Sequence, residues 1–146
     1  MKILVVDDEK DIQPLFEQRF RKEIRKGEIQ FVFSFSGEEA LVCLKKYQHE
    51  AVLILSDINM PGMSGLDLLA QIKQKNHVPP PVVMMITAYG DDENYKKAME
   101  LGADDFLAKP LDFITLKEIL GVKILTDVHT EGQVSRCRGV AEPRTR

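Results

Sequence analysis

The sequence has few of the features that mark membrane, secreted or thiolate-metal proteins. Its 146 residues contain only two cysteines, Cys43 and Cys137, and these are not spaced as metal ligands. No apolar run approaches the roughly 20 residues that a membrane-spanning helix needs, and Ile3–Val6 is too short for the core of a signal peptide. We therefore expect a cytoplasmic protein with free thiols and no membrane contact.

A strong excess of positive charge is also missing. The whole chain has a net charge of −3, and residues 121–146 hold five Lys and Arg against three Asp and Glu, so residues 1–120 carry −5. This acidic balance argues against direct binding to nucleic-acid phosphates and suits a protein that holds a cation. The sequence contains no Gly-x-x-x-x-Gly-Lys loop either, which argues against a P-loop nucleotide enzyme.

Five short apolar segments alternate with five segments of helical periodicity. The apolar segments have the length of strands, and several are typical of strands buried on both faces; they are Ile3–Val6, Gln30–Phe35, Ala51–Leu55, Val82–Ile86 and Phe106–Ala108. Helices are predicted over residues 11–25, from Ser36, from Ser64, over 91–101, and from Phe113 to Leu125. The alternation predicts an α/β fold, with a doubly wound parallel sheet and helices on both faces.

The length suits a single domain, which we assign to residues 1–125. From Thr126 onward the apolar periodicity disappears and the composition becomes polar. Residues 126–146 are therefore predicted to form a disordered tail.

Chemically capable side chains follow four of the five predicted strands. An aspartate such as Asp57, taken alone, is more often a helix cap or a loop residue than a functional group. Here, however, the strand ends carry a set of such residues: Asp7 and Asp8, Asp57, Thr87, and Lys109. The carboxyl ends of parallel strands meet at one edge of the sheet, where open α/β sheets bind their ligands.

The chemistry of this set points to a cation and a phosphoryl group. Three carboxylates close together repel one another, so one would stay protonated unless a cation intervened. Mg²⁺ suits such a site because it takes few carboxylates and keeps bound water. With the ammonium group of Lys109 nearby, Asp57 would be set up to receive a phosphoryl group, and the hydroxyl of Thr87 could donate a hydrogen bond to it.

The same residues resemble the motifs of receiver domains from bacterial two-component response regulators, of the chemotaxis-regulator-like kind. The resemblance covers about residues 1–120. It is carried by Asp7-Asp8, by Asp57-Ile58-Asn59-Met60-Pro61-Gly62-Met63-Ser64-Gly65, by Thr87-Ala88, and by Leu101-Gly102-Ala103-Asp104-Asp105-Phe106 leading to Lys109-Pro110.

The resemblance implies a flavodoxin-like fold with strand order 2-1-3-4-5 and a role for each matching residue. It implies that Asp57 accepts a phosphoryl group from a histidine kinase or a phosphotransfer protein in a phosphorelay. Mg²⁺ would be held by Asp7, Asp8, Asp57 and the backbone carbonyl of Asn59. Lys109 would bind the phosphate, Thr87 and Phe106 would form the switch pair, and the Lys109–Pro110 peptide bond would be cis.

The implied function is a non-enzymatic signalling switch whose altered face is recognised by a downstream protein or effector domain. A dimer that forms on phosphorylation is left open, as is whether the receiver stands alone or belongs to a larger regulator. The rival reading is an aspartyl-phosphate phosphatase, but such enzymes keep an acid two residues after the nucleophile and this chain has Asn59 there. A degenerate receiver that only binds a partner is disfavoured by the complete acidic set.

Overall fold

Five parallel strands form one sheet in the order β2-β1-β3-β4-β5. The computed structural model describes residues 1–48, 50–75, 79–88 and 90–130. Within them the strands are β1 (Lys2–Val6), β2 (Gln30–Ser34), β3 (Val52–Asp57), β4 (Val82–Ala88) and β5 (Asp105–Lys109). The predicted fold class and the strand order implied by the family resemblance are both confirmed. The chain divides into two units, Met1–Leu111 and a second that begins at Asp112.

The central strands are buried on both faces, as continuous apolar runs require. Every residue of β3 is buried. Successive side chains of a strand point to opposite faces of the sheet. One face, formed by residues such as Leu4, Ile54 and Met85, belongs to the core cluster that also includes Leu44 and Leu69 from the covering helices.

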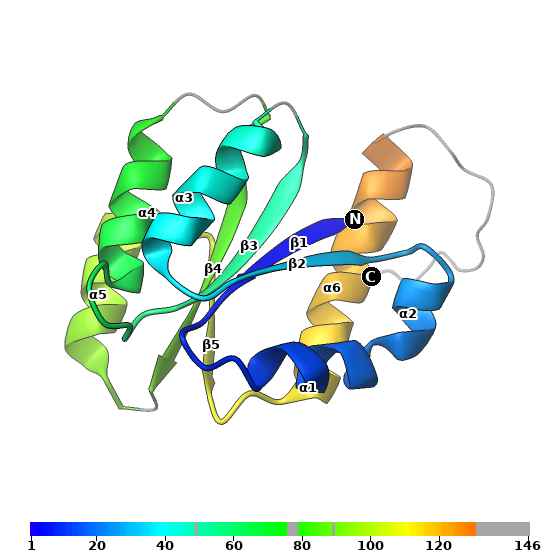
Figure 1. Ribbon diagram of the computed structural model, residues 1–146, viewed down its shortest axis with the longest axis horizontal. Coiled ribbons are helices and arrows are strands. Elements are labelled where there is room, and N and C mark those ends of the chain that lie inside the picture. Colours follow the sequence, from blue (N-terminus) through cyan, green and yellow to red (C-terminus); the bar gives the residue numbers. More distant parts are fainter. Residues whose placement is uncertain (49, 76–78, 89, 131–146) are drawn as a thin grey trace. The chain divides into compact units, whose positions relative to one another are not determined.

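Three helices cover that face: α3 (Gly37–Lys46), α4 (Gly65–Gln74) and α5 (Asp92–Glu100). Figure 1 shows them in a row on one side of the sheet. Each begins at a residue whose side chain accepts a hydrogen bond from a backbone N–H of the first turn, namely Ser36, Ser64 and Asp91. Such caps satisfy N–H groups that have no partner within the helix.

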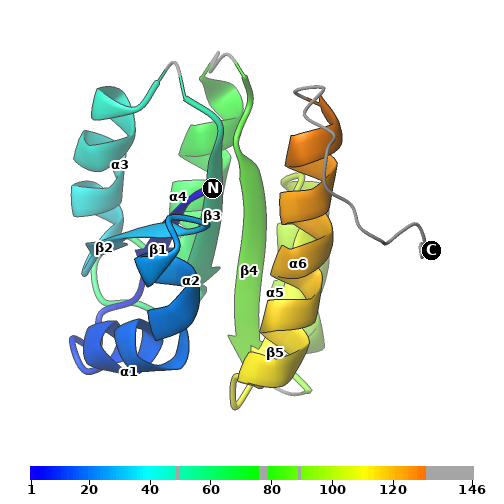
Figure 2. The ribbon, with the colours of Figure 1, turned by 90° about the vertical axis from the view of Figure 1, so that its right-hand side faces the viewer.

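The helix expected over residues 11–25 is interrupted, which corrects that prediction. The structure has α1 (Ile12–Arg19) and α2 (Arg21–Arg25), which meet at an angle beside β2 in Figure 2. Phe20 separates them, with φ −110° and ψ 23° outside the helical range. Its ring and that of Phe16 pack edge-on against Phe31 of β2, with centroids 5.2 and 5.5 Å apart.

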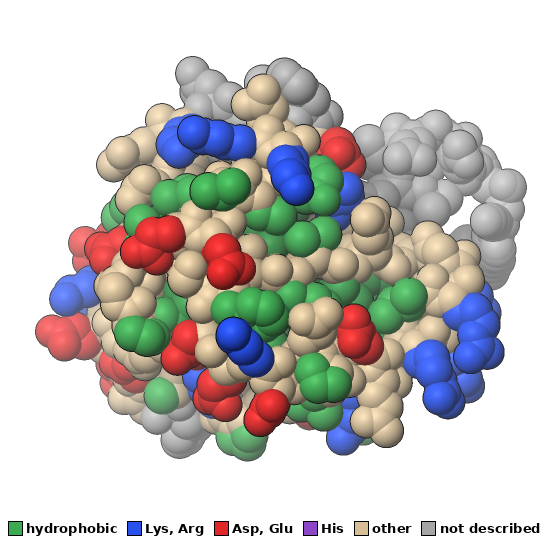
Figure 3. Space-filling view, in the orientation of Figure 1, with side chains coloured by type: hydrophobic (Ala, Val, Ile, Leu, Met, Phe, Trp, Pro, Cys, Tyr) green, Lys and Arg blue, Asp and Glu red, His purple; other side chains and the backbone are tan. Residues whose placement is uncertain are grey.

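Basic side chains gather over α2 in the view of Figure 3. The four concerned are all exposed to solvent: Arg21, Lys22, Arg25 and Lys26. This exposure agrees with the reading of a solvated helix face and leaves the apolar residues of α1 to do the packing.

The second unit contains α6 (Phe113–Thr130). Asp112 directly precedes this helix. Its carboxylate accepts hydrogen bonds from the Thr115 hydroxyl and from the N–H groups of Thr115 and Ile114 in the first turn. These bonds lower the pKa of the Asp112 carboxyl. The helix extends beyond Leu125, where it was expected to end. Residues 131–146, most of the predicted tail, lie outside the described residues.

None of the helices that the structure describes combines the length and the apolar character needed to cross a bilayer.

Candidate functional site

Asp57 occupies the centre of the site at the carboxyl end of β3. That strand lies between β1 and β4, and its last side chain is buried, with 2% of the residue exposed. The two carboxylate oxygens have different partners. The ammonium Nζ of Lys109 lies 2.8 Å from Oδ2, and the backbone N–H of Asn59 donates to Oδ1 over 3.3 Å. A buried carboxylate needs such partners to remain charged.

Two further carboxylates lie beside Asp57. β1 pairs with β3 in a register that sets Val6 opposite Ser56, so Asp7 follows directly at the level of Asp57. One oxygen from each of Asp7, Asp8 and Asp57 lies within 4.8 Å of the others. Asp7 is buried and Asp8 is exposed, so the group opens to solvent on one side.

The pKa of Asp7 shows how these acids act on one another. Burial raises the pKa of this carboxyl above its usual 3.8, the N–H of Glu9 at 2.9 Å lowers it, and the charge of Asp57 raises it again. The charges of Lys109 and Asp8 have smaller, opposite effects. The net increase means that a further cation at this position would be favoured, since it would stabilise the ionised form.

Lys109 reaches the site from the end of β5. Burial acts to lower the pKa of its ammonium group, but the hydrogen bond to Asp57 and the charges of Asp57, Asp7 and Glu9 outweigh it and raise the pKa above 10.5. Lys109 is therefore charged at neutral pH. The Lys109–Pro110 peptide bond is cis, which confirms the expectation from the resemblance.

The loop after Asp57 is held in place by glycine. The N–H of Gly65 donates to the carbonyl of Ile58 over 2.7 Å, and a Cβ at Gly65 would collide with the carbonyl oxygen of Asp57. Gly62 has φ +75°, a conformation that side chains disfavour. Ser64 and Asp67 then form a capping box that begins α4. The Gly/Pro signal of the sequence thus corresponds to a loop pressed closely against the buried aspartate.

Thr87 and Phe106 lie on β4 and β5, the strands beyond Asp57. Asp57 pairs with Ile86, so Thr87 is one residue further along the same edge, and it is buried. Phe106 pairs with Met85 and is half-buried. Its ring centroid lies 4.3 Å from that of Tyr95 on α5. The position of Thr87 agrees with the predicted edge, while the switch roles of both residues stay predictions.

The structure brings together most of the residues singled out from the sequence. Asp7, Asp8, Asp57 and Lys109 form one cluster, and Asn59 joins it through its N–H group. Two contributors were missed. The first is the backbone N–H of Glu9, which donates to Asp7; a backbone contact of this kind leaves no pattern in the sequence. The second is Tyr95 on α5, an exposed aromatic residue whose contact with Phe106 the sequence did not predict.

The acidic group fits a hard divalent cation. Its donors are all carboxylate oxygens within reach of one another, and the pKa of one of the acids, Asp7, is raised chiefly by burial and further by the charge of Asp57. Oxygen donors of this kind are the ligands of Mg²⁺.

Comparison with known protein families identifies the family of this chain. Residues 3–121 match the model of the response regulator receiver domain. The chain belongs to that family. As a receiver domain, it takes part in two-component signal transduction.

Two relatives and one structure illustrate the similarity. This chain is 36% identical over 126 residues, 84% of its length, to the response regulator protein PilR of Pseudomonas aeruginosa. It is 35% identical over 127 residues, 85% of its length, to the transcriptional regulatory protein ResD of Bacillus subtilis. A crystal structure of a response regulator receiver protein from Pseudomonas putida has a TM-score of 0.70 at 29% identity, covering 83% of this chain and 95% of that one.

The chain spans 26% of the length of PilR and 47% of the length of ResD. The similarity therefore concerns one part of those regulators, and their names describe larger proteins.

Proposed function

We propose that this receiver domain is a phosphorylation-dependent switch and that Asp57 is its phosphoryl acceptor. The observation that carries the proposal is the position of the Asp57 carboxylate, buried at the end of the central strand and paired with Lys109 at 2.8 Å beside two further acids. The family match supports the signalling class.

In the proposed reaction, a carboxylate oxygen of Asp57 attacks the phosphorus of a phosphohistidine on a kinase or phosphotransfer protein. The new P–O bond gives an acyl phosphate, and the P–N bond breaks with its electron pair going to the imidazole of the donor. Lys109 offers a fixed positive charge to the phosphoryl oxygens, and the hydroxyl of Thr87 is the candidate hydrogen-bond donor to them.

The acidic group would be occupied by Mg²⁺, with Asp7, Asp8, Asp57 and the backbone carbonyl of Asn59 as its proposed ligands. When bound, the ion supplies positive charge to the phosphoryl oxygens. The contribution of the chain itself is to hold the acids in place. Asp7 accepts from the N–H of Glu9, and the loop that leaves Asp57 is fixed by the Gly65–Ile58 hydrogen bond.

The partners in this proposal are a histidine kinase or phosphotransfer protein as donor and a downstream protein or effector domain as reader. A phosphatase that turns over many substrate molecules is the other candidate, but Asn59 provides no acid two residues after Asp57. We therefore propose a switch that is not itself an enzyme, apart from its part in its own phosphorylation and slow dephosphorylation.

The test uses a small phosphoryl donor, acetyl phosphate, with Mg²⁺ and no kinase. Intact-mass measurement should show one added phosphoryl group on the wild-type chain and none on Asp57→Asn. Label that persists in Asp57→Asn would place the acceptor elsewhere. Steady turnover of a phosphomonoester by the wild type would favour the phosphatase instead.

A further inference from the structure

The outer edge of β2 is unpaired in the sheet that the structure describes. β2 is the first strand of the sheet and pairs only with β1. The N–H of Gln30 donates to Met1 and the carbonyl of Ser34 accepts from Asp7, so the even-numbered residues of β2 direct their backbone groups toward β1. The N–H and C=O groups of Phe31 and Phe33 therefore point away from the sheet.

This edge lacks the devices that usually prevent strand pairing. The sequence of β2, Gln-Phe-Val-Phe-Ser, contains no proline and no charged residue. Proteins commonly protect edge strands with lysine, proline or a bulge. Only the residue after the strand is covered, because the N–H of Phe35 donates to the carboxylate of Glu39 over 3.1 Å. Two successive outward residues remain available for backbone hydrogen bonds.

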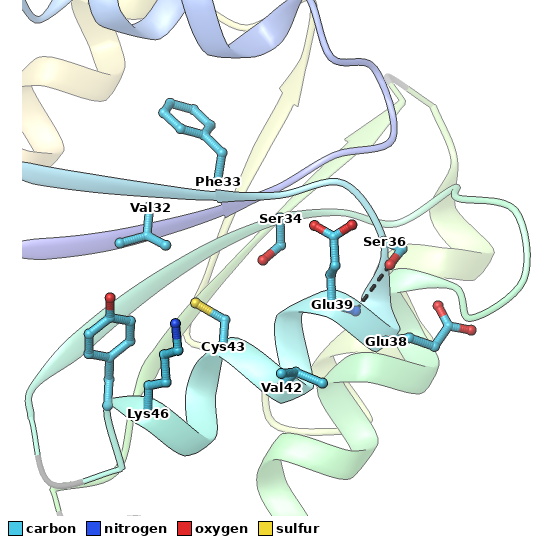
Figure 4. Close-up of a pocket in the computed structure, with 10 residues that line it drawn as sticks. Val32, Phe33, Ser34, Ser36, Glu38, Glu39, Val42, Cys43 and Lys46 are labelled. Carbon is cyan, nitrogen blue, oxygen red and sulfur yellow. Dashed lines mark hydrogen bonds between the residues drawn. The ribbon is translucent and has the colours of Figure 1, made fainter.

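A groove runs along this edge between β2 and α3. Its volume is about 560 Å³, and Figure 4 shows its lining, with Cys43 between Val32 and Ser34. Apolar groups form its middle, and Val42 of α3 is 67% exposed there. Glu38 and Glu39 lie at one end of this part of α3 and Lys46 at the other.

The charges of the groove are complementary to those of a second groove turned end for end. Glu39, Val42 and Lys46 follow one another at helical spacings of three and four, so they form a stripe on one side of α3. The order is acidic, apolar, basic. When two such stripes run antiparallel, each acid meets a base and the apolar centres meet each other. A two-fold interface requires this kind of self-complementary patch.

We propose that β2 and α3 form a homodimer interface in which the β2 strands of two copies pair antiparallel. Phe31 of one copy exchanges backbone hydrogen bonds with Phe33 of the other, which sets Val32 opposite Val32 on the two-fold axis. The α3 helices then run side by side, with Glu39 of each copy facing Lys46 of the other. The two sheets become one sheet of ten strands.

A second copy fits this edge better than an unrelated peptide, because the same short segment supplies both the strand and the matching charges. The interface is small, so we expect a dissociation constant between about 1 µM and about 1 mM, the range of weak complexes. It uses neither Asp57 nor its neighbours and so does not depend on the proposed phosphorylation.

The test is a disulfide on the two-fold axis, made in the full chain with Cys43→Ser and Cys137→Ser. Directly opposed Cβ atoms in an antiparallel pair lie about 4.5–5.5 Å apart and are closest in a non-hydrogen-bonded pair, where they approach the roughly 3.5–4.5 Å of a disulfide. Val32→Cys should therefore form a covalent dimer under mild oxidation. Gln30→Cys is the matched control. Residue 30 lies on the same face of β2 and is more exposed, but in the proposed dimer the residue 30 side chains of the two copies would be about 13 Å apart. We expect at least tenfold faster dimer formation by Val32→Cys. Equal rates, or none for Val32→Cys, would overturn the proposal.

A second test measures the self-association of charge-reversed variants by analytical sedimentation. Lys46→Glu and Glu39→Lys should each weaken self-association at least fivefold, and an equimolar mixture should restore it, because opposite charges then face one another in the mixed dimer. Failure of the mixture to recover would overturn the antiparallel arrangement, as would a wild type that stays monomeric up to about 1 mM. Asp57→Asn should associate like the wild type, so this outcome is separable from that of the phosphorylation test.

Discussion

Lys109 and Asp57 form an ion pair across the intervening strand β4, with 2.8 Å between Nζ and Oδ2. The carboxylate is almost fully buried, while the lysine side chain is 39% exposed. Lys109→Gln should therefore lower the free energy of unfolding of the metal-free protein by about 1–3 kcal/mol, less than for a fully buried pair because water screens the lysine.

Urea unfolding in the presence of a metal chelator measures this loss of free energy. The matched control is Lys73→Gln, which removes the ion pair with Asp104 at 3.2 Å, where both side chains are partly exposed. That change should cost less than about 1 kcal/mol. Equal losses in the two variants would show that the Lys109–Asp57 ion pair stabilises the fold no more than an exposed pair does.

Mg²⁺ should stabilise the folded protein, because it binds the gathered acids of the native state. The melting temperature should rise steadily with Mg²⁺, and a concentration 100 times the dissociation constant corresponds to about 2.7 kcal/mol. Asp7→Asn and Asp57→Asn should each reduce the response, whereas Glu93→Gln on α5 should leave it intact. A wild-type melting curve that does not move at millimolar Mg²⁺ would rule out the metal site.

The pH dependence of stability should report the raised pKa of Asp7. Burial raises this pKa in the folded state above the 3.8 of an ordinary aspartate. The charges of Asp57 and Asp8 raise it further, whereas the hydrogen bond from the Glu9 N–H and the charge of Lys109 lower it. The folded state thus holds the proton more tightly than the unfolded state. Its advantage is complete below pH 3.8 and is lost as the pH rises through the folded value.

Asp7→Asn removes this titration and keeps an oxygen for the N–H of Glu9. In a chelator, the melting temperature of Asp7→Asn relative to the wild type should therefore increase from pH 3.5 to pH 7. With saturating Mg²⁺ the difference should shrink or reverse, since the wild type then gains a ligand. A difference that stays constant with pH would contradict the raised pKa.

The sequence predicted the site well because parallel strands place their carboxyl ends on one edge. Asp7, Asp57 and Lys109 are far apart along the chain, yet the strand–helix alternation alone was enough to group them. The roles of Asn59 and the cis bond at Pro110 came only from the family resemblance, because composition and periodicity contain no information on them.

Other features depend on contacts that periodicity does not encode. The apolar spacing from Ile12 to Ile24 is continuous, but the packing of Phe20 on Phe31 accompanies a break in the helix. The contact of Tyr95 with Phe106 requires the relative placement of α5 and β5. The groove at the edge of β2 likewise arises only once α3 lies over that strand.

Gly65→Ala should destabilise the protein although alanine is the better helix former. A Cβ at this position would collide with the carbonyl oxygen of Asp57, so the loop must shift, at a cost of about 1–3 kcal/mol. Gly121→Ala in α6 is the control, because its Cβ would meet nothing within 4 Å, and it should gain up to about 1 kcal/mol. Acetyl phosphate labelling of Gly65→Ala should also slow, as the loop sets the position of Asp57. Unchanged stability and labelling would show that the loop yields freely.

Thr87 should pass the phosphorylation signal on to Phe106. They lie on neighbouring strands, where Phe106 is opposite Met85, two residues before Thr87. Phe106 is half-buried and its ring contacts that of Tyr95. Movement of the Thr87 hydroxyl toward a phosphorylated Asp57 would open space beside β4, and an inward turn of Phe106 would then break its contact with Tyr95. The two packings need differ by only a few kcal/mol for one hydrogen bond to select between them.

Thr87→Ala should therefore still accept a phosphoryl group on Asp57 but lose the structural response. Amide chemical shifts of residues 95–101 and 113–120, with and without a phosphate mimic, measure that response. Thr87→Ser is the matched control, since it keeps the hydroxyl and should keep the shift changes. If the shifts of Thr87→Ala move as far as those of the wild type, the signal leaves Asp57 by a route that does not include this threonine, and the contact between Phe106 and Tyr95 is then a packing contact alone.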